Sequence, residues 1–455
     1  MTRPIAVGLI VGVLAFAAAP SPPEFHIPFE RYKLANGLRV VLARDNSIPV
    51  AAVYLIFDAG GRTEDKGTFG YAHLIARLMF EGSRNLKKGE YERLIHANGG
   101  TYSGADRLDY SEYSSAMPSN MLPLALWMEA ERLRNPDITA EKLKSAKDSI
   151  RAGKTALLEQ PYRDAMLNAW RQTVFSDPRD RQTAFTGPGD VESATVGQVT
   201  SVFHSWYSPS NAALVVAGDF DTAQLKKSID LYFAGLPAAA PPKHPAISEP
   251  ERAEGIHTEV ADPHARFPAV IVGWPAPRRS TPEWHALELL DAILTQGRDS
   301  KLEIEMMRGR QSILQADENV GWPTSTALDY KDPGYFAAMF IYKPTFTAME
   351  IARQYEDILS SIALSGLDSQ EFLRARAAFR YARATAAQSA LGRAQLLGIH
   401  EILDGDAAAA ERDYAAVIAL SIDQVRSAIT KYLTEKRADI VSIKPGTAAP
   451  AGNAR

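Results

Sequence analysis

The chain has 455 residues, of which 46% are hydrophobic and 23% charged, so its bulk has ordinary globular composition, not that of a disordered, collagen-like or coiled-coil protein. At roughly 100–200 residues per domain, this length corresponds to two or three domains. The net charge of -4 and the lack of a basic patch make nucleic-acid binding unexpected. Because there is no cysteine, disulfides, thiolate nucleophiles and Cys-ligated metals are excluded, and only His, Asp and Glu remain as metal ligands.

Residues 1–19 have the pattern of a secretory signal peptide. Arg3 precedes an apolar run from Ile5 to Ala19, and the small residues Ala15 and Ala17 provide a cleavage site. The alternative, a short membrane anchor, would need a run of about 20 residues. We therefore expect an exported, periplasmic protein whose mature chain has no membrane span.

Residues 24–236 combine strands and helices. Two apolar, β-branched runs, Gly37–Ala43 and Val50–Asp58, are separated by turn residues and predict strands. Apolar residues at helical spacing then predict five helices, at Tyr71–Phe80, Lys88–Ala97, Asn120–Leu133, Ala140–Glu159 and Val196–Tyr207. This mixture indicates an α+β fold, in which a mainly antiparallel sheet carries helices on one face.

The second half of the chain repeats features of the first. A Pro/Ala-rich stretch at 237–254 is typical of an interdomain linker. The segment that starts at Thr195 returns 226 residues later at Ser421, and in both copies an amphipathic helix leads into a buried strand. We therefore predict two homologous domains, with the second at 255–446, and a flexible tail at 447–455.

Together these segments resemble the insulinase/pitrilysin zinc metallopeptidase family, in particular its mitochondrial processing peptidase-like two-domain branch. The resemblance extends over nearly all of the mature chain and depends on the order of several motifs rather than on one of them. These motifs are Leu38–Leu42, Gly70–Ser83, Asn98–Ser103, Trp206–Gly218, Ala286–Leu294 and Ser300–Leu302.

The resemblance places the family's zinc motif at His73, but the motif is degenerate. In His-x-x-Glu-His, two His at i and i+4 bind Zn²⁺, and the Glu takes a proton from the metal-bound water. Here Ala76 stands at the Glu position and Arg77, a permanent cation with no lone pair to donate, at the second His. The third ligand, a Glu on a later helix, corresponds to Gly153. We therefore expect no zinc in this chain and no activity of the chain alone.

The substrate-binding Arg and Tyr that many relatives carry in the second domain are also missing. By register they correspond to Met307 and Leu314, seven residues apart. Arg308 is one residue out of register and is expected to lie at a solvated helix end. His285 and Glu288 have His-x-x-Glu spacing but no second His, so they predict an ordinary helix segment, and the remaining histidines, His400 among them, show no ligand spacing.

One family feature that needs little side-chain chemistry is retained. The resemblance implies that an edge strand binds an extended peptide through backbone pairing. Its expected residues are Gly99, Gly100, Ser103, Gly104 and Ala105, with Ser103 at a position where the family usually has Asn.

These features predict a non-catalytic subunit that forms a chamber wall and a peptide-binding surface for a zinc-bearing paralogue, most simply as a heterodimer. Two alternatives remain open. One is an active zinc metalloendopeptidase with an unrecognised site, and the other is a structural or peptide-binding subunit of another complex.

Overall fold

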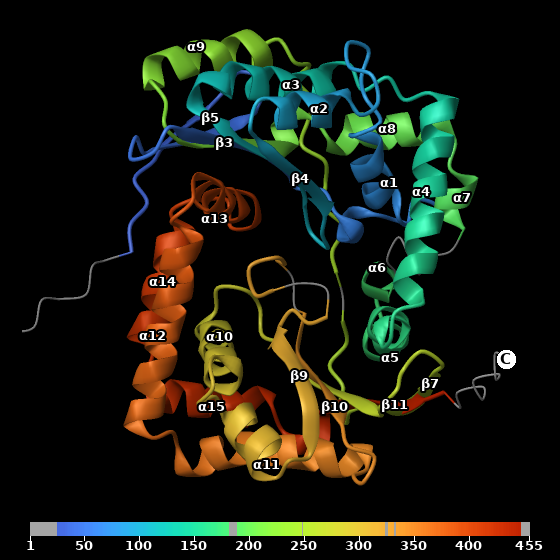
Figure 1. Cartoon of the computed structure of the whole chain (residues 1–455), viewed down its shortest axis with the longest axis vertical. Coiled ribbons are helices and arrows are strands. Elements are labelled where there is room, and N and C mark those ends of the chain that lie inside the picture. The colour runs from blue at the N-terminus through green and yellow to red at the C-terminus, as the bar shows by residue number, and fades with distance from the viewer. Residues whose placement is uncertain (1–24, 182–188, 248, 324–325, 332–333, 447–455) are drawn as a thin grey trace, which may run out of the picture.

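The computed structural model describes residues 25–181, 189–247, 249–323, 326–331 and 334–446 (Figure 1). The predicted signal peptide (1–19) and tail (447–455) lie outside the described residues. Within these ranges, no helix is both long and apolar enough to cross a membrane.

The first half forms a six-stranded sheet in the order β1-β2-β6-β3-β5-β4. Only β2 and β6 pair in parallel, so the sheet is mainly antiparallel, as predicted. Its edges are β1, a short polar strand that the sequence did not predict, and β4. The strands are β1 (Glu30–Lys33), β2 (Arg39–Arg44), β3 (Val50–Phe57), β4 (Thr101–Asp106), β5 (Ser111–Pro118) and β6 (Ala212–Gly218).

The predicted helices of the first half are present and pack on one face of this sheet. Their apolar stripes meet the alternate side chains of the central strands, such as Val53 and Leu55 of β3, in one buried core. The main helices are α1 (Tyr71–Leu78), α2 (Glu90–Ala97), α3 (Leu122–Arg134), α4 (Ala140–Leu158), α8 (Val196–Trp206) and α9 (Thr222–Phe233).

The second half repeats this arrangement with five strands in the order β7-β11-β8-β10-β9, again with one parallel pair, β7 and β11. The α+β fold class is therefore confirmed. The strands are β7 (His257–Asp262), β8 (Ala269–Pro275), β9 (Ile313–Val320), β10 (Tyr335–Tyr342) and β11 (Asp439–Pro445). The helices are α10 (Pro282–Thr295), α11 (Ala348–Ser365), α12 (Ser369–Ala386), α14 (Ala409–Ala419) and α15 (Ile422–Tyr432).

The equivalent helices α8 and α15 begin in the same way. Thr195 and Ser421 are their N-caps, and each forms a capping box with a Gln three residues later, Gln198 or Gln424. In such a box two otherwise unpaired backbone N–H groups are satisfied, which fixes the start of the helix. Each helix then leads into a buried strand, β6 or β11.

The sequence predicted helices on one face of each sheet. In the structure the second face of each sheet is covered as well, by helical residues from the other half of the chain. The helix α13 (Ala390–Leu403) of the second half packs on β3 and β6. In return, the helical segment Ala165–Val174 of the first half places Trp170 on the second sheet. Figure 1 shows α13 directly below the first sheet.

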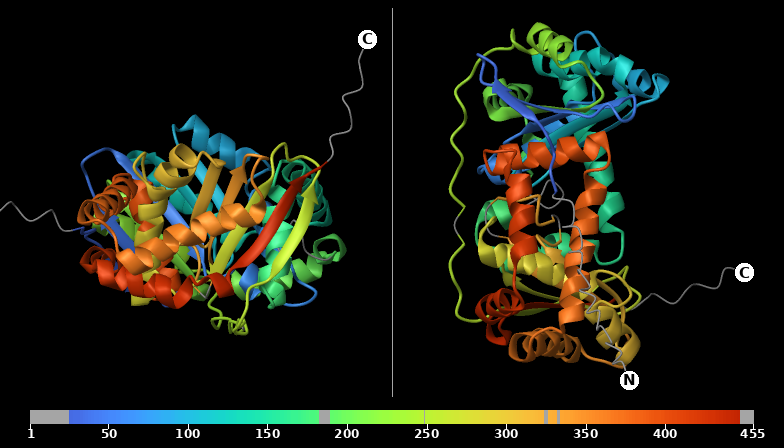
Figure 2. Two further views of the ribbon diagram at one scale, coloured as in Figure 1. Left: turned by 90° about the horizontal axis from the view of Figure 1, so that it is seen from below. Right: turned by 90° about the vertical axis from the view of Figure 1, so that its left-hand side faces the viewer.

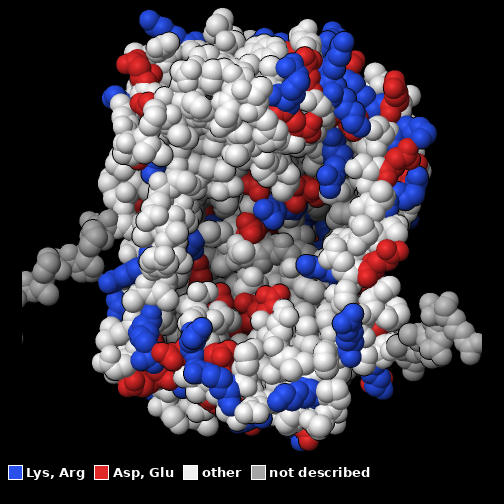
Figure 3. Space-filling view, in the orientation of Figure 1, with Lys and Arg blue, Asp and Glu red and all other residues white. Residues whose placement is uncertain are grey.

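The two halves are connected by an extended segment. Residues 237–247 and 249–256 form no helix or strand and run along the outside of the molecule (Figure 2, right). Between the two sheets, the space-filling view shows a hollow with both acidic and basic side chains around it (Figure 3).

Candidate functional site

Helix α1, which carries the degenerate motif, is capped by a buried carboxylate. Gly70 precedes the helix in the left-handed conformation, with a φ of 90°. The backbone N–H groups of Gly70 and Ala72 donate to the two oxygens of Glu64, each at 2.6 Å. Burial raises the pKa of Glu64 to about 8 despite these hydrogen bonds, and the nearby charges of Asp106 and Asp190 raise it further.

His73 is buried on α1 and is held by a carboxylate on the edge strand. Its Nδ1 lies 2.7 Å from Oδ1 of Asp106, the last residue of β4. Burial alone would raise the pKa of Asp106, but the hydrogen bond and charge of His73, together with the charge of Arg77, hold it below its ordinary value. The ring orientation of His73 is therefore fixed by an ionised carboxylate, as in many metal-binding histidines.

The other positions of the motif offer no ligand. Ala76 is buried and contributes only a methyl group, and Arg77 is exposed. Gly153 lies on α4, which packs against α1. The structure thus places all four motif positions on one pair of packed helices, three on α1 and Gly153 on α4. Only His73 among them can bind a metal, and a single imidazole cannot hold a catalytic zinc, which needs three protein ligands.

The predicted peptide-binding edge is open. Strand β4 pairs with β5 on one side and is the last strand of its sheet within the described part of the chain. Ser103 and Gly104 are exposed and Ala105 is half-buried. Gly99 and Gly100 form the turn before the strand, and a Cβ on Gly100 would lie only 2.7 Å from Met117. An extended chain can therefore pair with the free backbone edge of β4.

The positions expected to carry the family's Arg and Tyr hold apolar side chains in the part of the second domain that the structure describes. Met307 is half-buried and packs against the core, and Leu314 on β9 is an exposed apolar side chain. Arg308 is exposed near the end of the helical segment Glu303–Gly309, where its guanidinium is 3.4 Å from Glu303 and 3.7 Å from Asp299. The positive charge of Arg308 is therefore balanced by two carboxylates of its own segment of the chain.

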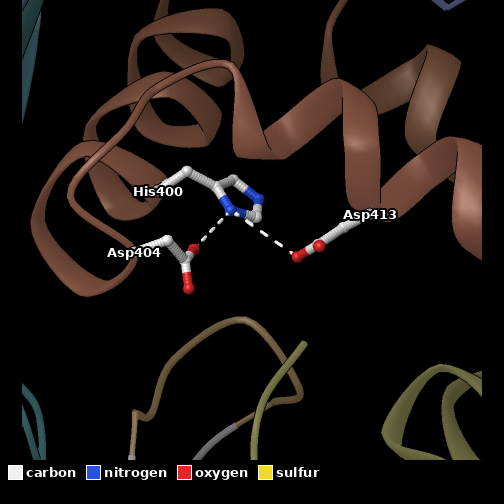
Figure 4. Close-up of side chains that lie close together, drawn as sticks. All are labelled: His400, Asp404 and Asp413. Carbon is white, nitrogen blue, oxygen red and sulfur yellow. Dashed lines mark hydrogen bonds and ion pairs between the residues drawn. The ribbon is translucent and has the colours of Figure 1, made fainter. Parts of the chain in front are cut away.

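Sequence reasoning missed one cluster with metal-ligand chemistry, which is the one such group found among the described residues. His400 Nδ1 lies 2.7 Å from Asp404 and 3.8 Å from Asp413 (Figure 4). The guanidinium of Arg279 donates to both Asp404 oxygens, at 2.9 and 3.1 Å, and its Nη2 is 3.2 Å from His400 Nδ1. A cation therefore already occupies this cluster, and its side chain would repel a metal ion.

This cluster extends into the helix segment that the sequence predicted to be ordinary. His285 Nε2 lies 3.6 Å from Asp413, and Glu288 forms an ion pair with Arg383. Burial lowers the pKa of His400, and the charge of Arg279 lowers it further, against the opposing effect of Asp404. The only signal in the sequence was the i, i+4 spacing of His400 and Asp404, which is common on helices and was not informative.

The fold and helix α1 together define a class of protein. It is a chain of two homologous α+β domains in which the helix that corresponds to the zinc-binding helix of a peptidase has lost its zinc ligands. Residues 39–184 match the family "Insulinase (Peptidase family M16)", and residues 193–379 match "Peptidase M16 inactive domain". The chain belongs to the insulinase family, peptidase family M16.

Curated relatives include both a named zinc protease and subunits of complexes. "Zinc protease PqqE" of Helicobacter pylori is 24% identical over 68% of this chain and 70% of its own length. "Mitochondrial-processing peptidase subunit beta" of Lentinula edodes is 19% identical over 89% of this chain and 87% of its own. "Cytochrome b-c1 complex subunit 1, mitochondrial" of Bos taurus is 23% identical over 62% of this chain and 58% of its own.

Solved structures show the same fold. A protease from Helicobacter pylori has a TM-score of 0.86 at 18% identity and covers 92% of this chain and all of its own. A peptidase M16 inactive domain from Pseudomonas fluorescens has a TM-score of 0.80 at 18% identity, over 93% of this chain and 99% of its own.

Proposed function

We propose that this chain is an exported, non-catalytic subunit of a zinc metalloendopeptidase-type complex, which binds peptide and closes a chamber around the active site of a zinc-bearing paralogue. The observation that carries the proposal is the combination at α1 and β4. The motif positions Ala76, Arg77 and Gly153 offer no ligand, whereas the edge strand beside them remains exposed. Zinc is expected in the partner and not in this chain.

Loss of the metal and retention of the edge strand are physically compatible. Strand addition uses backbone N–H and C=O groups, so it tolerates the loss of nearly every catalytic side chain. A chamber built from two such chains needs two walls but only one metal. Several relatives are named as subunits of larger assemblies, among them mitochondrial-processing peptidase subunits and cytochrome b-c1 complex subunit 1, which supports a family paralogue as the partner.

The test is to purify the chain alone and together with a co-expressed paralogue that has an intact His-x-x-Glu-His motif. Zinc content and cleavage of an unstructured peptide are measured for each preparation. We expect zinc and cleavage only with the paralogue present, and the variant His73→Ala should leave the zinc content of the pair unchanged. Stoichiometric zinc in the lone chain, lost in His73→Ala, would contradict the proposal.

The relative named as a zinc protease supports the first alternative, an active peptidase. That alternative predicts chelator-sensitive cleavage by the chain alone. The relationship to a cytochrome b-c1 subunit supports the second, a subunit of a non-proteolytic complex, which predicts a stable assembly that shows no cleavage with any paralogue.

A further inference from the structure

A cavity of about 720 Å³ lies at the junction of the two halves, away from the zinc-motif helix. Residues 25–28, the end of β2, the last turns of α12 and parts of α13 and α14 line it. Helices α12 and α14 form the left-hand side of the molecule in Figure 1 and face the viewer in the right panel of Figure 2. We call this cavity the arginine pocket because Arg44, Arg380 and Arg393 line it. Its size is typical of sites for small ligands, which span about 300–1,000 Å³.

The arginine pocket carries an excess of positive charge. Arg393 is fixed by an ion pair with Asp45 at 2.7 Å and by hydrogen bonds to the carbonyls of residues 387 and 388. Arg44 donates to the neutral amide oxygen of Asn46, and Arg380 has no carboxylate partner among the residues that the structure describes. Among the described residues that line the pocket, Asp45 is the one acidic side chain, and the lining residue His26 pairs with Glu411 at 2.9 Å. The lining thus holds three guanidinium groups and one carboxylate.

Two of these guanidinium groups have unused donors. The Nε atoms of Arg380 and Arg393 are shielded from solvent and make no hydrogen bond within the described part of the chain. A shielded N–H donor without an acceptor leaves the guanidinium group incompletely satisfied within the protein. Guanidinium groups bind carboxylates well because the planar fork can donate two parallel hydrogen bonds.

The rest of the lining is apolar and aromatic. Phe25 packs on Tyr414 with ring centroids 4.8 Å apart, and Tyr381 is 73% exposed on α12. The small residues Ala384 and Ala387 leave space beside these rings. A ligand therefore meets cationic donors and apolar rings in one cavity.

We propose that the arginine pocket binds a carboxylate attached to an apolar body, namely the C-terminal residue of a peptide that ends in an aromatic or aliphatic side chain. The guanidinium groups of Arg44 and Arg380 hold the carboxylate, and the rings of Phe25, Tyr381 and Tyr414 contact the side chain. This site is separate from β4, and its ligand binding does not depend on the proposed role beside a zinc-bearing paralogue.

Calorimetric titration of the purified chain with N-acetyl-phenylalanine and with its primary amide tests the carboxylate. We expect the amide to bind at least about tenfold more weakly, because it cannot pair with a guanidinium as an anion. Arg380→Gln should weaken binding of the acid to a similar extent. Arg374→Gln, an exposed arginine earlier on the same helix, is the matched control and should leave the affinity unchanged.

A second variant and a second ligand complete the test. If Arg380→Gln does not fold, Arg44→Gln, an exposed side chain at the end of β2, takes its place. The affinities of an acetylated pentapeptide ending in phenylalanine and of octanoate are compared. Tighter binding of the peptide supports a peptide C-terminus as the ligand, whereas tighter binding of octanoate overturns that assignment in favour of a free organic acid. Equal binding of acid and amide, equal losses in Arg380→Gln and Arg374→Gln, or no binding up to about 5 mM would overturn the proposal altogether.

Discussion

The residues at the zinc-motif position retain the support of a metal site although the ligands are gone. Asp106 fixes His73 at 2.7 Å, and α4 with Gly153 lies against α1. The motif positions could be named from the sequence because the resemblance to the family fixes their register along the chain. The His73–Asp106 pair could not, since it joins residues 33 positions apart in the chain through the place of β4 at the sheet edge.

Restoring the ligands should restore metal binding. In the variant Ala76→Glu/Arg77→His/Gly153→Glu, two His at i and i+4 and a Glu on the adjacent helix provide the three ligands of a catalytic zinc. We expect bound zinc by elemental analysis of the purified variant, at a clearly higher stoichiometry than in the unchanged chain. The same variant with His73→Ala should lose it. No gain in zinc would show that the register assigned to α1 and α4 is wrong.

A buried carboxyl pair in the second domain should make stability depend on pH. Burial raises the pKa of Asp291 from 3.8 to about 7 and that of Glu318 well above its ordinary value. The charges of Glu288 and Asp317 raise the pKa of Asp291 further, and those of Asp291 and Asp317 raise the pKa of Glu318 further. The folded state therefore holds protons that the unfolded state releases. The stabilisation from Asp291 is complete below about pH 4 and is lost as the pH rises to about 7, by at most about 1.4 kcal/mol per pH unit.

The variant Asp291→Asn removes this titration and keeps an acceptor for the Thr295 hydroxyl, which donates to Asp291 at 3.1 Å. Denaturant unfolding at pH 4, 5.5 and 7 should show that the free energy of unfolding falls less steeply in the variant than in the unchanged chain. Asp299→Asn, on an exposed side chain, is the control and should not alter the slope. Parallel curves for Asp291→Asn and the unchanged chain would exclude a protonated carboxyl at this position.

At the scale of elements, periodicity predicted the main helices and central strands of the first half, but it did not identify α13 or where that helix packs. All residues from Leu396 to Leu403 are buried, which is typical of a helix enclosed on several sides. That pattern was present in the sequence, but it cannot tell which sheet covers the helix, because the contact with β3 and β6 is long-range. Strand β1 was missed for the opposite reason, since its residues are polar and lie at an exposed edge.

The close approach of α13 to the first sheet depends on Gly398. A Cβ at this position would lie 2.5 Å from the ring of Tyr54, which is fully buried and cannot move aside. Gly398→Ala should therefore lower the free energy of unfolding by about 1–3 kcal/mol, as overpacking does in other cores. Gly197→Ala on α8, where a Cβ meets nothing within 4 Å, is the matched control and should be neutral or stabilising by up to about 1 kcal/mol. Equal effects in chemical denaturation would mean that α13 does not sit against Tyr54.

At the scale of the whole molecule, each half covers one face of the other half's sheet with a helix, so the two halves share two hydrophobic cores. The cluster around Tyr54, Val215 and Leu397 joins the first sheet to α13, and the cluster around Trp170, Ile271 and Tyr335 joins the second sheet to the first half. Ion pairs add to the first contact, since Arg31 lies 2.7 Å from the fully buried Glu401 of α13. The internal duplication in the sequence indicated two similar domains, but it could not indicate that each domain packs a helix on the sheet of the other.

The linker should consequently be dispensable for holding the halves together. A protease site inserted between residues 241 and 247, in the extended segment outside both cores, allows it to be cut in the folded protein. We expect the two fragments to co-elute in size-exclusion chromatography after cleavage and to separate only in denaturant, because separation would expose both mixed clusters to water. A fragment ending before the linker, expressed alone, would leave the α13-facing side of its sheet uncovered and should aggregate, which is typical of large exposed apolar surfaces. Separation of the cut fragments under native conditions would show that the two clusters contribute too little to hold the halves as one body.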